Sequence, residues 1–99
     1  MNNERLNGAI ESILNNSDVN KKDLCDKTIE LLIKLKIFNG DKYVLSDMII
    51  KGLLETVSKF TNNPNICINA CKIFQTNLND EEGKIINNNK QILFYYLFF

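Results

Sequence analysis

The chain has 99 residues, 44% of them hydrophobic, and its 12 basic residues balance 12 acidic ones. This length allows one domain, spanning 1–99, and the hydrophobic content favours a folded chain over a disordered one. Zero net charge removes the long-range attraction on which nonspecific nucleic-acid binding depends, so a nucleic-acid partner is not expected.

The first predicted element is a helix over 3–15. Its apolar residues recur at helical spacing, and the polar run Asn15-Asn16-Ser17-Asp18 predicts its end. Those apolar residues are Leu6, Ile10, Ile13 and Leu14.

A second helix is predicted over 21–37. Asn20 is the expected N-cap, with Asp23 three residues later in a loose capping-box arrangement. The apolar residues cover more than half of the circumference, which predicts that this helix packs between two neighbours. They are Leu24, Cys25, Thr28, Ile29, Leu31, Leu32, Leu35 and, at the margin, Ile33.

Two interpretations are open for the segment that follows. Asn39-Gly40-Asp41 predicts the end of the second helix, because glycine tolerates the left-handed geometry of a helix C-terminus. Asn39-Gly40 is also a hairpin-turn signal, and Tyr43-Val44-Leu45 is strand-like, so a short β-hairpin is the alternative. The long helical runs on either side favour helices. Ser46 or Asp47 is then expected to cap the next helix.

The clearest helix pattern lies over 48–60, where apolar residues keep a three-and-four spacing. The turn at 61–64 ends it, and Asn65 is the expected cap of a further helix over 66–78. Ala70, at the centre of that helix, is small enough to let another helix axis pass close. Together these segments predict a tight helical hairpin.

The last residues, 92–99, are all apolar or aromatic, and this run is too short to span a bilayer. An apolar helix of two turns must be covered on every side. A following unit, a second chain or a membrane surface can cover it, the membrane being disfavoured, and a truncated gene product is a further alternative. The residues expected to make this apolar C-terminal contact are Phe94, Tyr95, Tyr96, Phe98 and Phe99.

The three cysteines and the absence of histidine limit the chemistry. Cys67 and Cys71 lie on one helix face, but zinc sites normally need four ligands, so we expect no metal and small buried side chains at Cys25, Cys67 and Cys71. Without histidine a nucleophile lacks its usual base, and no glycine-rich phosphate loop is present, so neither an enzyme nor a cofactor is expected. The odd cysteine count and an N-terminus unlike a signal peptide predict reduced thiols and a cytoplasmic location.

The chain also contains a weak internal repeat. Sliding it on itself by about 42 residues places Leu24-Cys25 over Ile66-Cys67, Thr28 over Ala70, and one helix-breaking run over another. A period near 40 with about three helices is typical of a helical solenoid.

Residues 65–78, preceded by 50–60, resemble the second and third helices of an armadillo repeat. In that family a leucine-rich helix precedes a helix with a central alanine, a large apolar residue four positions later and another three beyond; Asn77 departs from the last position. The resemblance covers about residues 6–99 and extends to HEAT-type repeats. It implies an all-α fold, a right-handed α-solenoid fragment of stacked helical hairpins that can continue beyond Phe99, with a small helical bundle as the alternative.

Armadillo repeats imply a concave groove, lined by third helices, that grips extended peptides. Carried onto this chain, the groove positions fall on Glu30, Lys34, Lys72 and Thr76, and the alternative is that these are ordinary solvated residues. The nuclear-import type has Trp and Asn there, and this chain has no Trp, so binding of import signals is not expected.

Two functional hypotheses follow. The first is a noncatalytic protein–protein interaction module that binds a protein or peptide partner or stacks into a longer array. The second is a small helical regulator or adaptor that self-associates through its aromatic C-terminal helix.

Overall fold

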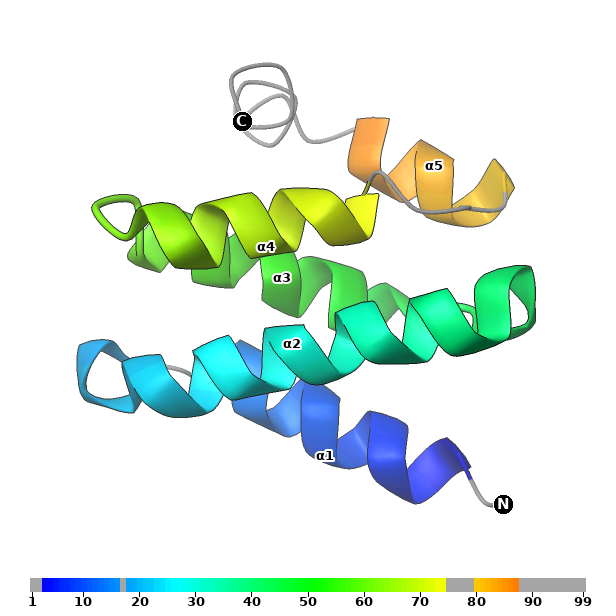
Figure 1. Ribbon diagram of the computed structural model, residues 1–99, viewed down its shortest axis with the longest axis horizontal. Coiled ribbons are helices and arrows are strands. Elements are labelled where there is room, and N and C mark those ends of the chain that lie inside the picture. Colours follow the sequence, from blue (N-terminus) through cyan, green and yellow to red (C-terminus); the bar gives the residue numbers. More distant parts are fainter. Residues whose placement is uncertain (1–2, 17, 75–79, 88–99) are drawn as a thin grey trace.

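A computed structural model describes residues 3–16, 18–74 and 80–87, and every regular element within these ranges is helical (Figure 1). The predicted all-α class is therefore confirmed. The α-helices are α1 (Asn3–Asn15), α2 (Lys22–Asn39), α3 (Asp47–Lys59), α4 (Pro64–Phe74) and α5 (Asp80–Asn87), and the 3-10 helices are η1 (Val19–Lys21) and η2 (Gly40–Lys42).

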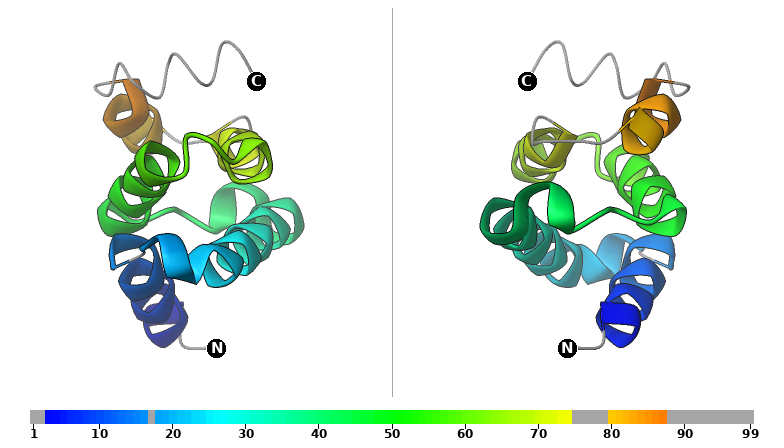
Figure 2. Two further views of the ribbon diagram at one scale, coloured as in Figure 1. Left: turned by 90° about the vertical axis from the view of Figure 1, so that its left-hand side faces the viewer. Right: turned by 90° about the vertical axis from the view of Figure 1, so that its right-hand side faces the viewer.

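The helices form two layers. Figure 2 shows α1, α3 and α5 stacked in one layer and α2 beside α4 in the other. α3 packs on both α1 and α5, α2 packs on α4, and contacts between α1 and α2 and between α3 and α4 join the layers. Successive helices run in opposite directions, so helices within a layer are parallel (Figure 1).

One continuous core fills the space between the layers. It draws on α1 to α4 and on the connection between α2 and α3, where Tyr43 and Leu45 are buried and Val44 is exposed. That connection is extended but pairs with no strand, and Gly40 begins η2, so the alternative β-hairpin is wrong. Gly40 has a φ of 58°, the left-handed region expected of a glycine that ends a helix. The largest fully buried apolar side chains are Ile10, Leu14, Ile29, Leu32, Ile49, Ile50, Leu53, Ile66, Ile73 and Val57.

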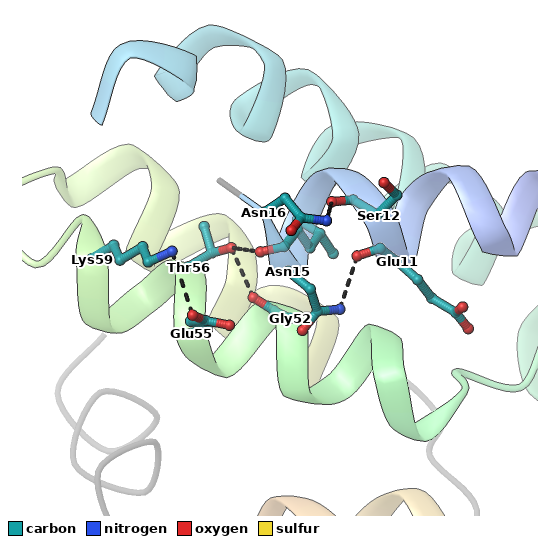
Figure 3. Close-up of polar contacts among 9 residues, drawn as sticks. Glu11, Ser12, Asn15, Asn16, Gly52, Glu55, Thr56 and Lys59 are labelled. Carbon is teal, nitrogen blue, oxygen red and sulfur yellow. Dashed lines mark hydrogen bonds and ion pairs between the residues drawn. The ribbon is translucent and has the colours of Figure 1, made fainter. Parts of the chain in front are cut away.

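α1 crosses α3 at very close range beside Gly52 (Figure 3). A Cβ atom built on Gly52 would lie 2.6 Å from the Cβ of Leu14, so only glycine fits there. Next to this contact, the Thr56 hydroxyl is 2.8 Å from the Gly52 carbonyl and 3.4 Å from the Leu14 carbonyl. The threonine is fully buried, and these carbonyls satisfy its hydroxyl.

Polar side chains fix the end of α1 to the start of α3. The amide nitrogen of Asn15 donates to the Met48 carbonyl at 2.9 Å and to the Glu11 carbonyl at 2.8 Å. α1 itself ends where the sequence predicts, at Asn15.

Two of the predicted helix caps are wrong, and one is confirmed. Ser46 caps α3, its hydroxyl accepting from the amide of Ile49 at 3.2 Å. The segment before α2 is capped by Asp18, not Asn20, and Asp18 serves the 3-10 turn η1 by accepting from the Asn20 amide. α4 begins at Pro64, two residues before the prediction, because Asn63 supplies the cap.

Replacing Asn63 with Ala is expected to lower the free energy of unfolding by about 1 kcal/mol, because the Asn63 side chain accepts from the Ile66 amide at 3.3 Å. Asn65→Ala is the matched control, since Asn65 is exposed and one residue inside the helix. Urea unfolding followed by far-ultraviolet circular dichroism measures both. Equal losses for the two variants would contradict the assignment of Asn63 as the cap.

Candidate interaction surface

The groove residues predicted from the sequence lie on the layer made by α2 and α4. Glu30 and Lys34 are on α2 and Lys72 is on α4, and all three side chains are exposed. Thr76 lies outside the described residues. No hydrogen bond or ion pair joins Glu30, Lys34 or Lys72 to another residue of the described ranges.

The structure brings Glu30 and Lys72 into equivalent positions. α2 and α4 are parallel neighbours, and residues that correspond in the two helices are both buried, such as Cys25 with Cys67 and Thr28 with Ala70. Glu30 and Lys72 hold the same position relative to these pairs, so they face the same way on adjacent helices, whose axes pack about 8–10 Å apart.

Asp26 belongs to the same surface, and the sequence analysis missed it. Its Oδ1 atom is buried and has no hydrogen-bond partner among the described residues. Because Asp26, Glu30 and Lys34 are spaced four apart on α2, they follow one another along one face of the helix. We call Asp26, Glu30, Lys34 and Lys72 the charged face.

α2 packs between two neighbours, α1 and α4, as its wide apolar pattern predicts. These neighbours do not cover the whole apolar surface. Leu24 and Leu31 are 47% and 38% exposed, and Phe38 near the C-terminal end of α2 is 85% exposed.

A second polar cluster connects α1 to the segment before α3. The Tyr43 hydroxyl donates to Asn7 Oδ1 at 2.6 Å, and the Ser46 hydroxyl donates to Glu11 Oε1 at 2.6 Å. Burial, and secondarily the Glu11 charge, raises the pKa of Tyr43. The Ser46 oxygen also accepts from the Ile49 amide, so these groups are engaged in holding the connection against α1.

Lys36 and Glu82 form a buried ion pair that the sequence analysis did not find. Lys36 Nζ lies 3.2 Å from Glu82 Oε2, and the two side chains are 0% and 1% exposed. Glu82 Oε2 also accepts from the Leu45 amide at 2.6 Å. The pair attaches α5 to the end of α2 and to the connection that precedes α3.

The three cysteines are buried with free thiols, as their apolar surroundings in the sequence predict. Burial raises the pKa of Cys67, and burial together with neighbouring Cys67 raises the pKa of Cys71 to about 11. The Cys67 thiol donates to the Phe60 carbonyl at 3.4 Å. Among the described residues, no three His, Cys, Asp or Glu side chains gather as metal ligands would.

We expect Cys67 and Cys71 to react with a disulfide reagent only after unfolding, because both thiols are buried and their raised pKa keeps them protonated at neutral pH. The folded state holds the Cys71 proton more tightly than the unfolded chain, so the associated stability is present below about pH 9 and is lost as the pH rises towards 11. Thiol titration with and without denaturant, and urea unfolding at a series of pH values, measure these effects. Rapid labelling of Cys71 in the native protein at pH 7 would contradict them.

The predicted contact residues Phe94, Tyr95, Tyr96, Phe98 and Phe99 lie outside the described residues. Over the ranges that are described, no helix combines the length and the apolar character needed to cross a membrane.

In comparisons with known proteins, no family model, curated protein or solved structure matches this chain.

Proposed function

We propose that this chain is a noncatalytic protein-interaction module, an armadillo-like pair of helical hairpins whose charged face binds an extended peptide segment of a partner protein. α2 and α4 are parallel and lie side by side, which is the arrangement that a solenoid needs to present one continuous binding surface. The right-handed solenoid assignment is part of this proposal.

The observation that carries the proposal is the unsatisfied charged face. Asp26 Oδ1 is buried without a donor, and a buried acceptor without a partner costs about 1–3 kcal/mol. Asp26 as a residue is partly exposed, so a peptide backbone amide or a basic side chain laid across α2 can donate to its carboxylate group. Glu30 and Lys72, on adjacent helices, can then contact groups of opposite charge on either side of the peptide.

A selection from a displayed library of random, unstructured peptides on the immobilised full chain tests the proposal. We expect to select peptides that bind the native protein. Their affinity should fall at least about tenfold when Glu30→Ala and Lys72→Ala are combined, because removing a charged group that contacts the partner costs binding free energy.

The matched control combines Lys51→Ala with Glu81→Ala, which removes one base and one acid from exposed positions in the layer of α1, α3 and α5. Binding should be unchanged in the control. Selected peptides that bind the Glu30→Ala, Lys72→Ala protein as tightly as the native one would rule out the charged face as the site.

A further inference from the structure

One edge of α2 carries a line of exposed apolar side chains. Leu24, Leu31 and Phe38 are seven residues apart, which places them on one line along the helix. We call these three residues the α2 stripe. The neighbours of α2 leave all three side chains exposed, and an exposed apolar surface can mark an interaction site.

The equivalent positions on α4 already pack on a helix. Ile66 and Ile73 correspond to Leu24 and Leu31 in the internal repeat, and both are fully buried in the core that α4 shares with the neighbouring helices. The corresponding positions are thus packed against other helices in α4 and exposed to solvent in α2. The natural occupant of the α2 stripe is therefore another helix.

The charges beside the α2 stripe indicate what kind of helix fits. Lys27 lies between Leu24 and Leu31, three residues after one and four before the other, and Lys34 holds the same position between Leu31 and Phe38. Both lysines are exposed and border the stripe.

No acidic residue borders the α2 stripe. Asp23 and Glu30 each directly precede a stripe residue, which places them about 100° round the helix. The opposite border is formed by Thr28 and Leu35. A second copy of α2 would therefore bring lysines without any carboxylate to face them, which argues against pairing of α2 with itself.

We propose that the α2 stripe docks an amphipathic helix of a partner protein whose apolar line is bordered by aspartate or glutamate. The apolar line packs on Leu24, Leu31 and Phe38 as α4 packs on α2, and the acidic border meets Lys27 and Lys34. This surface goes beyond the proposed function, because Leu24, Leu31 and Phe38 take no part in the peptide site. The two surfaces meet at Lys34, which belongs to the charged face and borders the α2 stripe.

Two synthetic amphipathic helices test the proposal. They share one leucine line, bordered by glutamate in the first and by lysine in the second. Fluorescence anisotropy with the full chain should show binding of the glutamate peptide that weakens with salt, and at least about tenfold weaker binding of the lysine peptide. Leu31→Ser should weaken binding of the glutamate peptide about tenfold or more. Lys27→Glu should reduce or reverse the preference for the glutamate peptide over the lysine peptide.

Lys51→Glu on α3 is the matched control for charge, and the Glu30→Ala, Lys72→Ala protein separates the two surfaces; both should bind the glutamate peptide normally. Equal binding of the two peptides, or binding unaffected by Leu31→Ser, would overturn the proposal. Binding to vesicles of anionic phospholipid that is lost in Leu31→Ser, with neither peptide bound, would overturn it in favour of a membrane surface.

Discussion

Replacing Glu82 with Ala should lower the free energy of unfolding by about 3–5 kcal/mol, a large share of the stability of a small domain. The loss arises because Lys36 would stay buried without its carboxylate and the Leu45 amide would lose an acceptor 2.6 Å away. Urea unfolding measures the change. Glu82→Gln, which keeps an acceptor oxygen but removes the charge, should fall between the native protein and Glu82→Ala.

Two controls separate the ion pair from a general effect of altering α5. Glu81→Ala removes the neighbouring, exposed carboxylate and should change stability by no more than about 0.5 kcal/mol. Combining Lys36→Met with Glu82→Leu should recover part of the loss, because an apolar pair has no uncompensated buried charge, while the Leu45 amide still lacks its acceptor. A loss below about 1 kcal/mol for Glu82→Ala would contradict the buried pair.

Gly52→Ala should also destabilise the protein, by about 1–3 kcal/mol, although alanine is the better helix former by about 1 kcal/mol. The added Cβ would meet the Cβ of Leu14 at 2.6 Å, and that atom cannot swing away as the end of a long side chain can. α1 and α3 would have to separate, which weakens the packing between these two helices of one layer.

Gly8→Ala provides the matched control, because Gly8 lies on α1 with nothing within 4 Å of an added Cβ. At Gly8 the higher helix propensity of alanine is not offset by a steric clash, so the free energy of unfolding should rise by up to about 1 kcal/mol. The two substitutions are chemically identical and should have opposite signs. Stabilisation by both would show that α1 and α3 are not in close contact at Gly52.

Local pattern was sufficient to predict α1 to α4, but α5 (Asp80–Asn87) was not predicted. The apolar spacing of 3–15 and 48–60 yields α1 and α3 within a residue at each end, because each helix turns one apolar stripe to the core. The cap of α4 was predictable in principle. Proline favours the first helical position, so Pro64 marks Asn63, rather than Asn65, as the cap.

Tertiary contacts explain what the sequence analysis missed. Glu82 stands in a polar run and looks solvated, and only the fold brings it to Lys36, far away along the chain. Leu24 and Leu31 fit a buried pattern, yet they are 47% and 38% exposed. An isolated glycine in a helical pattern, such as Gly52, often has a packing reason, and that signal was present.

The candidate surface was only partly predictable. The armadillo resemblance selected Glu30, Lys34 and Lys72 as groove candidates, and the structure shows that they are exposed on α2 and α4, which ordinary solvated residues would be too. Asp26 has the same residue type as many solvated helix positions, and the burial of its Oδ1 atom depends on tertiary packing. No local pattern carries that information.

The most direct test of the central claim is backbone amide chemical-shift mapping of the full chain during titration with a peptide selected on it. The account predicts that the largest shifts fall on the charged face, at Asp26, Glu30, Lys34 and Lys72, and that they saturate with a single affinity. Shifts concentrated on α1, α3 and α5, with the charged face unchanged, would contradict it.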